Sequence, residues 1–412
     1  MIKVSGIITR YLLALLFIFS GFVKSVDPMG SAIKFQEYFV AFGMEWLTPL
    51  ALFFAVVLCA AELLLGLMLL LGIYKRITAW AVLIFMSFFT VLTFIIMLTD
   101  PVSDCGCFGD AVKLSNSATF YKNIIFLGAA VGNFIWNRSG KEQNRFRALI
   151  SFLLLTAFSA GICIYSLIWL PAVEFLPYKI GVNIPEAMSI PPDAPQSEHE
   201  TTLIYKDKQT GEEKEFAIED TTWYDTSRWE YVDTRDKVIK EGFIPVITGF
   251  TIMDNRGYDC TEQILNTENL VFVLIIREIT PASIEPFRIE MEKLYRFAEA
   301  NGFGFICFTS SNTEDAERYL AEITDIPVVC YNLDETVIKS VVRAEAGVVV
   351  LNEGTIVAKW NIRTIPEFDT LQQMEKSFEK AAARQGYFYA AVIFGFVIIA
   401  AFYLFRPATK KE

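Results

Sequence analysis

Two cysteines separated by one glycine, Cys105 and Cys107, are the residues of this chain best suited to redox chemistry. The intervening Gly106 can adopt the backbone angles that a very small disulfide ring requires. Such a ring departs from relaxed disulfide geometry, and strain makes a disulfide easier to reduce. Three interpretations stay open: an exchangeable dithiol, a static disulfide that clips a loop, and two unrelated reduced thiols. No metal site is predicted, because two thiols and the distant His199 do not make a four-ligand set.

Charged residues inside otherwise apolar stretches form a second group of candidates. Glu62 lies in the middle of such a stretch, where a carboxylate is by default a functional group; a structural ion pair or a protonated acid is the alternative. Lys24 closes the first apolar stretch and could either extend toward lipid headgroups or lower the pKa of a nearby thiol. Cys59 shares a helix face with Glu62, and the role of a small buried hydrophobic residue is expected for it.

A third charge, Arg10, is expected to pair with Glu62. At a rise of about 1.5 Å per residue, Arg10 lies about 21 Å below Lys24, and Glu62 lies about 20 Å below Pro49. The two charges therefore reach similar depths in the membrane. Because an unpaired ion in lipid costs several kcal/mol, the sequence predicts an Arg10–Glu62 salt bridge.

These candidates belong to a chain that is too apolar for a soluble protein. Of its 412 residues, 53% are hydrophobic and 36 are phenylalanine, and the formal net charge is −11. Nucleic acid is not an expected partner, because phosphate contacts need clustered Lys and Arg. Several stretches reach the length of about 20 mostly apolar residues that crosses a bilayer. They are residues 7–24, 50–72, 77–98, 119–137, 147–169 and 387–405.

Short basic loops predict the orientation of these spans. The segment Tyr74-Lys75-Arg76, the loop 137–147 and the tail from Arg406 carry Lys and Arg, which favours the cytoplasmic side. Loops 25–49 and 99–118 and the whole of 171–386 then face the opposite side. In a bacterium that side is the periplasm, where thiols can be oxidised. The expectation is a multi-pass protein of the inner membrane with a periplasmic domain.

The polar part of the chain divides into two regions. Residues 171–245 are expected to form a Pro-rich linker (171–200) and then a β-hairpin of TTLIYKD and EEKEFAI. Residues 246–385 alternate short β-rich runs with helical patterns, and this alternation predicts a three-layer α/β domain. The runs are 270–276, 303–309, 326–331, 347–352 and 355–360, and the helical patterns are 283–300, 312–323 and 367–385. The last helix is expected to continue into the sixth span, 387–405.

The order of these elements resembles a thioredoxin fold. Thioredoxins place Cys-x-x-Cys at the helix after the first of these strands, because a helix N-terminus lowers the pKa of a thiol. Here the stretch from Arg277 to Ser283 contains no cysteine, and Ala346 stands where a proline usually precedes the hairpin. The domain is therefore expected to be a redox-silent module that docks a periplasmic protein partner. Cys307 and Cys330 lie in apolar strands and are expected to be core residues.

The first four spans, residues 1–138, resemble the DoxX family and its relative, the methylamine-utilisation protein MauE. The resemblance is carried by Arg10 with FIFSGFVKSVDP (17–28), by Glu62 with LLLG and Arg76, and by SDCGCFGD (103–110) followed by TFYKN (119–123). It implies a four-helix membrane bundle with the cysteines at its periplasmic mouth. It also implies electron transfer or disulfide formation, because family members are linked to quinone-dependent thiosulfate oxidation and to maturation of a disulfide-rich amine dehydrogenase.

The leading hypothesis is a membrane thiol-disulfide or quinone oxidoreductase with Cys105 and Cys107 as catalytic residues. The implied cofactor is a membrane quinone. The candidate cofactor-binding residues are charged side chains of the membrane half: Lys24, Glu62, Arg10 and Asp110. The alternative is a non-catalytic membrane scaffold whose periplasmic domain recruits a protein and whose cysteine pair is only a clip. A small-solute transporter is disfavoured, because the sequence has no pair of broken helices and no repeated halves.

Overall fold

The computed structural model describes residues 2–102, 104–137, 145–195, 198–218, 220–240, 242–324 and 326–404. Within these ranges, six helices are long and apolar enough to cross a membrane. They are α1 (Ile2–Val26), α3 (Ala51–Leu71), α4 (Lys75–Thr99), α5 (Asn116–Asn137), α6 (Arg145–Trp169) and α13 (Leu371–Leu404). The expected spans are confirmed as apolar helices, and the chain is a multi-pass membrane protein. Most of the basic loop 137–147 and all of the tail from Arg406 lie outside the described residues.

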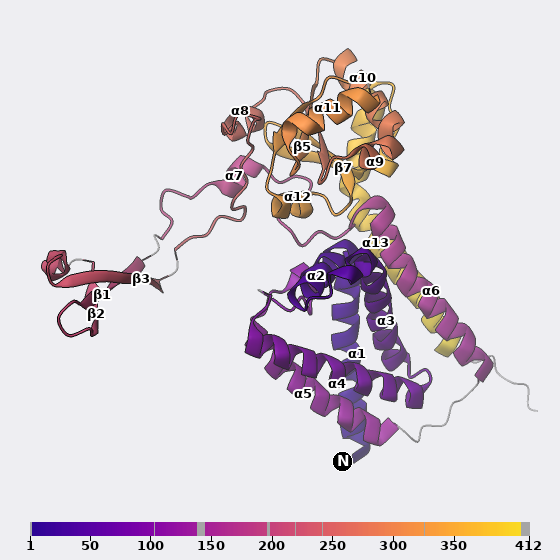
Figure 1. The fold of residues 1–412 in the computed structure, drawn as a ribbon. Helices are drawn as coiled ribbons and strands as arrows, with labels where there is room; N and C mark the ends of the chain where they lie inside the picture. Colours follow the sequence, from indigo (N-terminus) through magenta and orange to yellow (C-terminus); the bar gives the residue numbers. More distant parts are fainter. Residues whose placement is uncertain are drawn as a thin grey trace, which may run out of the picture. The chain divides into compact units, whose positions relative to one another are not determined.

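The helices α1 and α3 lie side by side (Figure 1), and glycines bring them into close contact. A Cβ atom on Gly66 would come within 2.6 Å of the Ile18 backbone nitrogen, and one on Gly21 would overlap the Leu63 backbone nitrogen. The two helices are antiparallel, so these contacts fix one register along their whole length. Small residues have this role in membrane helices because hydropathy alone does not choose a partner helix in lipid.

The helices α4 and α5 pack along each other and join α1 and α3 in a four-helix group. Their common core is made of buried apolar side chains from all four helices. It includes Phe17 of α1, Leu69 of α3, Val82 and Met86 of α4, and Ala130 of α5. Consequently one end of this group carries the loop between α4 and α5, where both cysteines of the CGC motif lie.

The connection between α1 and α3 contains the helix α2 (Pro28–Ala41) and the short 3-10 helix η1 (Glu45–Leu50). Asp27 caps α2 by accepting a hydrogen bond from the Gly30 backbone N–H at 2.8 Å, and Pro28 takes the first helical position. Residues 25–49, expected to be a loop, are therefore mostly helical. This difference matters for function because α2 contacts the cysteine loop directly.

The α/β domain contains a five-stranded sheet with the order β6-β5-β4-β7-β8. Its strands are β4 (Val271–Ile276), β5 (Gly304–Thr309), β6 (Val329–Asn332), β7 (Ala346–Asn352) and β8 (Thr355–Asn361). β4 is parallel to β5 and antiparallel to β7, β5 is parallel to β6, and β7 is antiparallel to β8. Every residue of β4 is buried, as expected for a central strand covered on both faces. All the expected strands are confirmed.

The helices of this domain include two that were not expected. They are α8 (Thr261–Leu265), α9 (Pro281–Ile284), α10 (Arg288–Ala300), α11 (Thr313–Thr324) and α12 (Glu335–Val341). α8 and α12 were not expected, and α12 separates β6 from β7, where the sequence predicted consecutive strands. Asp334 caps α12 by accepting a hydrogen bond from the Thr336 backbone N–H at 2.8 Å. Arg343, which follows α12, reaches the membrane half of the chain, as described below.

The α/β domain continues into the membrane through α13, which is unbroken as expected (Figure 1). The Arg384 guanidinium on α13 donates hydrogen bonds to the backbone carbonyls of Trp169 and Pro171 at the end of α6. Asn361 at the end of β8 donates to the Leu167 carbonyl at 3.1 Å. The end of α6 therefore contacts both the sheet and the helix that anchors it.

Residues 178–183 run beside β8 and are not part of a free linker. The Gly181 N–H donates to the Ile356 carbonyl at 2.7 Å, and Asn183 forms a β-bridge with Thr355. The expectation of an extended linker over 171–200 is therefore wrong for this segment. Residues 178–183 bind to the edge of β8, because the outer strand of a sheet offers unpaired backbone N–H and C=O groups.

Residues 184–250 form a separate compact unit. It begins with the short helix α7 (Ile184–Met188) and contains a three-stranded sheet with the order β2-β1-β3. The strands are β1 (Glu198–Asp207), β2 (Glu213–Ala217) and β3 (Trp229–Lys240). The expected hairpin is confirmed as β1 and β2, whereas the third strand was not expected.

Candidate redox site at Cys105 and Cys107

The Sγ atoms of Cys105 and Cys107 lie 3.2 Å apart in the loop between α4 and α5. Both residues are free thiols in this structure, and Cys105 is 8% exposed. Gly106 has a φ of +64°, a left-handed conformation that glycine adopts without steric cost. The glycine therefore turns the backbone so that the two neighbouring sulfurs meet, which is the arrangement of a dithiol ready to close.

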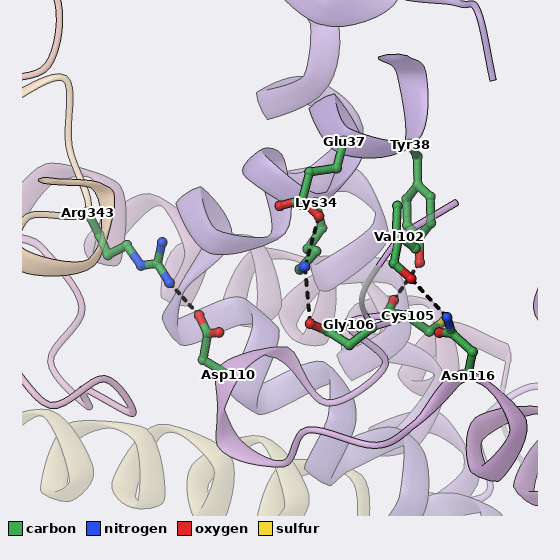
Figure 2. A network of polar contacts seen from close by, with 10 residues as sticks. Lys34, Glu37, Tyr38, Val102, Cys105, Gly106, Asp110, Asn116 and Arg343 are labelled. Carbon is green, nitrogen blue, oxygen red and sulfur yellow. Dashed lines mark hydrogen bonds and ion pairs between the residues drawn. The ribbon is translucent and has the colours of Figure 1, made fainter. Parts of the chain in front are cut away.

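Side chains from two helices hold the backbone on both sides of Gly106. The Tyr38 hydroxyl of α2 donates to the Cys105 carbonyl at 2.8 Å, and the Ser20 hydroxyl of α1 donates to the Cys107 carbonyl at 2.6 Å. Figure 2 shows the Tyr38 side chain reaching the cysteine loop. Because both carbonyls are held, the two thiols keep their mutual position without needing a covalent bond.

Asp104, the residue before the CGC motif, makes one contact with α2 and one within the cysteine loop. Asp104 accepts a hydrogen bond from the Gly106 N–H at 2.9 Å and forms an ion pair with Lys34 of α2 at 3.2 Å. Lys34 also pairs with Glu37 at 2.8 Å. The unexpected helix α2 is thus the main support of the cysteine loop.

The two thiols differ in acidity. A hydrogen bond from Cys105 lowers the pKa of Cys107 to about 6, burial opposes this shift, and the positive charges of Lys122 and Lys24 assist it. The same hydrogen bond and burial raise the pKa of Cys105. Cys107 is therefore the thiolate near neutral pH and Cys105 is its proton-bearing donor. A thiolate is the form of cysteine that attacks disulfides and other electrophiles.

Glu62 forms a salt bridge with Lys24, and the expected Arg10–Glu62 salt bridge is wrong. The Lys24 Nζ and Glu62 Oε2 atoms lie 2.7 Å apart, and both side chains are buried. The glycine contacts explain the difference, because the register that brings Gly21 against Leu63 also brings Lys24, one helical turn further along α1, within reach of Glu62. Counting residues from the ends of the apolar stretches gives the depth of each charge in the membrane, but it does not give the register between the two helices.

Arg10 lies at the opposite end of α1 and takes no part in the site. Its guanidinium is 4.7 Å from the centre of the Tyr11 ring, and a Cβ atom on Gly72 would be 3.3 Å from Arg10 Nη1. Cys59, by contrast, is fully buried near the site, with its Sγ 3.5 Å from the Ser31 hydroxyl. The expectation that Cys59 is a small buried residue is confirmed.

Asp110 is held by an arginine of the α/β domain. The Arg343 guanidinium forms an ion pair with Asp110 and a second one, at 3.0 Å, with Asp27 at the start of α2. Figure 2 shows Arg343 reaching Asp110 from the α/β domain. One guanidinium thereby joins the cysteine loop, α2 and the α/β domain, and the Arg343 side chain is 11% exposed.

Two pockets with different linings meet at the cysteine loop. One has a volume of about 280 Å³ and is lined mainly by charged and polar residues, including Asp27, Asp104, Asp110 and Arg343. The other has a volume of about 510 Å³ and is lined mainly by aromatic and aliphatic side chains, with Cys105 and Cys107 in its wall. Lys24, Ser31, Lys34 and Gly106 line both. The thiols therefore stand between a polar space and an apolar space.

Two further cysteines lie in the core of the α/β domain. Cys307 and Cys330 are neighbours on the paired strands β5 and β6, and both belong to the buried core of the α/β domain, as expected. The site residues that were not expected include Tyr38, Ser20, Lys34 and Arg343. Tyr38 could have been suspected from the Asp27-Pro28 helix start that places it on α2, whereas no local signal points to Arg343.

Comparison with known proteins agrees with the membrane half of this description. Residues 2–136 match a family described as methylamine utilisation protein MauE. The chain carries a MauE-like domain. The resemblance to the DoxX family rests on the motifs alone. Residues 199–241 match a domain of unknown function.

Among curated proteins, protein TlpB of Flavobacterium psychrophilum is 27% identical over 155 residues, which cover 36% of this chain and 42% of that protein. The chain thus spans less than half of the length of the curated relative that it matches. No solved structure matches the chain.

Proposed function

We propose that this chain is a membrane thiol-disulfide oxidoreductase that moves two electrons between protein thiols on its water-facing side and a lipid-soluble carrier. The observation that carries this proposal is the 3.2 Å approach of the Cys105 and Cys107 sulfurs in a loop whose cysteine carbonyls are both held by side chains. A dithiol held in this way converts to a disulfide with little backbone movement. The MauE-like domain supports a redox role in the membrane.

The exchange has two balanced half-reactions. In the first, a partner thiolate attacks the Cys105 sulfur of the closed disulfide and Cys107 leaves as a thiolate; a second partner thiol then resolves the mixed disulfide. The partner becomes a disulfide, and the two electrons and two protons reside on Cys105 and Cys107. In the second, the carrier accepts these electrons and protons and the disulfide closes again. The lowered pKa of Cys107 makes it the better leaving group of the two.

The α/β domain is the proposed docking module for the thiol partner, with a thioredoxin-like fold. The strand order β5-β4-β7-β8, with β4 parallel to β5 and antiparallel to β7, supports this assignment. After β4, the helix α9 begins at Pro281 with Thr280 as its cap, and no thiol stands in this turn. We therefore assign the acceptance of the partner's electrons to Cys105 and Cys107.

We propose the bacterial inner membrane as the location, with the cysteine loop and residues 171–386 in the periplasm. The basic segment at Lys75 and Arg76, at the start of α4, supports this orientation, because the cysteine loop follows the other end of α4. Reporter fusions at Gly140 and Gly211 test it and should report opposite compartments. Both reporters on the same side of the membrane would overturn the orientation.

A redox titration tests the function. Membranes are equilibrated with glutathione buffers, free thiols are trapped by alkylation, and peptides containing Cys105 and Cys107 are quantified by mass spectrometry. We expect one two-electron transition that is lost in Cys105→Ser and Cys107→Ser and unchanged in Cys260→Ser, a control in the α/β domain.

The scaffold alternative makes the opposite prediction for the same titration. A Cys105–Cys107 disulfide that stays closed in excess dithiothreitol would be a structural clip, and the chain would then act as a membrane anchor for a protein partner. Two thiols that stay reduced in oxidised glutathione would also overturn the redox function.

A further inference from the structure

The end of the membrane bundle opposite the cysteines contains a small pocket, where α1 and α5 meet the turn between α3 and α4. Two cations line it, Arg10 of α1 and Lys75 at the start of α4. Among the described residues, no Asp or Glu lines the pocket. Its volume is about 10 Å³, which admits about one oxygen-sized group. The pocket therefore combines two positive charges with room for one atom of a ligand.

Gly72 brings the two cations together. It has a φ of +73°, a left-handed conformation that glycine adopts without steric cost. The Lys75 Cε atom lies 3.1 Å from the point that a Cβ atom of Gly72 would occupy, and the Arg10 Nη1 atom lies 3.3 Å from the same point. The Thr78 hydroxyl donates to the Ile73 carbonyl at 2.8 Å and so ties this turn to the start of α4. Because like charges repel, their closeness costs free energy that a bound anion offsets.

Two buried nitrogen atoms in this region have no hydrogen-bond partner among the described residues. They are Arg10 Nε and the amide nitrogen of Asn133. Asn133 is 1% exposed and lines the pocket, and its Oδ1 accepts a hydrogen bond from Asn137 at 2.8 Å. Buried donors are nearly always satisfied in folded proteins, so an acceptor atom is expected here. Water fits by size, but only an anion also neutralises the two cations.

The pocket lies at the boundary of the membrane. Lys75 is the first residue of one candidate span, and Arg10 lies near the start of another. Their sequence neighbours Tyr11 and Ile77 are 41% and 62% exposed, as expected for side chains that contact lipid. Phospholipid headgroups carry a phosphodiester at this level, and basic pockets between membrane helices bind anionic headgroups.

We propose that this pocket binds a phosphate group through one oxygen, which accepts hydrogen bonds from Arg10, Lys75 and Asn133. The phosphate comes from an anionic phospholipid headgroup or from free phosphate in the water, and both sources present the same oxyanion. A bound phosphate joins α1, the turn between α3 and α4, and α5. The site does not depend on the proposed redox function, so the failure of either one leaves the other in place.

Removing one positive charge tests the site. Lys75→Gln removes a charge from the pocket, and Arg76→Gln is the matched control, because Arg76 is the next residue, is exposed and does not line the pocket. A general attraction of the basic turn to anionic lipid changes equally in both variants. Binding of dioleoylphosphatidylglycerol to the full chain is measured by native mass spectrometry from detergent micelles, with dioleoylphosphatidylcholine as the zwitterionic comparison.

We expect Lys75→Gln to raise the dissociation constant for phosphatidylglycerol at least about fivefold, whereas Arg76→Gln changes it less than about twofold. The dissociation constant for phosphatidylcholine should be at least about fivefold higher than that for phosphatidylglycerol in the wild-type chain, and neither variant should change it.

Inorganic phosphate distinguishes the two sources. The thermal unfolding midpoint of the full chain is measured in the same micelles with sodium phosphate or with sodium chloride of equal ionic strength. A rise in phosphate that Lys75→Gln abolishes and Arg76→Gln preserves assigns the site to free phosphate. No rise, together with selective lipid binding, assigns it to a phospholipid headgroup. If Lys75→Gln and Arg76→Gln do not differ with either probe, the proposal is wrong.

A carboxylate supplied by the chain itself gives an independent test. Asn133→Asp keeps the shape of the side chain and adds an anion to the pocket, so it should weaken phosphatidylglycerol binding at least about tenfold and raise the unfolding midpoint without lipid. Asn123→Asp is the control on the same helix, because Asn123 is 4% exposed and its amide donates to the Thr93 hydroxyl at 3.1 Å. This control should lower the midpoint and leave lipid binding unchanged. A lowered midpoint in Asn133→Asp as well would overturn the anion site.

Discussion

Lys24 Nζ lies 2.7 Å from Glu62 Oε2, and the two residues are 7% and 5% exposed. This buried pair fixes a positive charge at the boundary of both pockets, where it contributes to the acidity of Cys107. Glu62 does not line either pocket, so it acts on the site by positioning Lys24. A carboxylate in the middle of an apolar span thus has a definite partner.

Removing one member of the pair should destabilise the protein more than removing both. Lys24→Met or Glu62→Leu leaves an uncompensated buried charge, and each should cost about 3–5 kcal/mol, with the double variant well below the sum. Unfolding in mixed micelles titrated with dodecyl sulfate measures the cycle. Arg10→Met combined with Glu62→Leu is the control and should be additive. Additivity in the Lys24 cycle would contradict the pair.

The close contact of α1 and α3 should not tolerate a methyl group at its glycines. Gly21→Ala and Gly66→Ala each drive a Cβ into the facing backbone, so we expect a loss of about 1–3 kcal/mol. Gly128→Ala and Gly161→Ala are matched controls in membrane helices, because a Cβ there meets nothing within 4 Å. The same unfolding assay applies, and equal effects in both groups would show that these contacts are not tight.

The alkylation rate of Cys107 should depend on pH with a midpoint near 6. The pKa is lowered to about 6, so the thiolate predominates above that pH and the rate should fall about tenfold per pH unit below it. Timed iodoacetamide reactions read out by mass spectrometry measure this profile on reduced protein. Cys105→Ala removes the donor and should move the midpoint upward. A wild-type midpoint near the ordinary value of about 8.5 would refute the hydrogen-bonded thiolate.

Arg343→Ala should loosen the cysteine loop. It leaves Asp27 and Asp110 without their shared cation, and breaking such a buried pair typically costs about 3–5 kcal/mol. Arg343→Lys should rescue only in part, because an ammonium cannot serve two carboxylates with fork geometry. Hydrogen exchange of residues 106–111 should become faster. Arg363→Ala, at an exposed ion pair with Glu345, is the control and should leave that exchange unchanged.

The membrane spans and the strands of the α/β domain could be predicted because each rests on a local pattern. A run of apolar residues defines a span such as α3, and a short β-branched run such as 348–350 defines a strand wherever it is placed in the fold. The absence of a thiol after β4 was equally plain from the sequence. These features do not depend on which element packs against which.

The missed features depend on tertiary contacts. Arg343 meets Asp110 across 233 residues of chain, and no periodicity encodes such a distance. The partner of Glu62 follows from the glycine contacts between α1 and α3, and a hydropathy profile does not reveal these contacts. The helix α2 is an intermediate case, because its Asp27-Pro28 start is a recognised helix signal in the connection between two predicted spans.

The unbroken helix α13 couples the α/β domain to the thickness of the bilayer. Its 34 residues make a rod of about 51 Å, of which a hydrocarbon core of about 30 Å covers little more than half. A span answers a thinner or thicker membrane by changing its tilt. Because α13 has no proline at which it could bend, we expect the part that projects from the membrane to change its direction together with the span. We therefore expect bilayer thickness to act on the ion pairs of Arg343 with Asp27 and Asp110, beside the loop that carries Cys105 and Cys107.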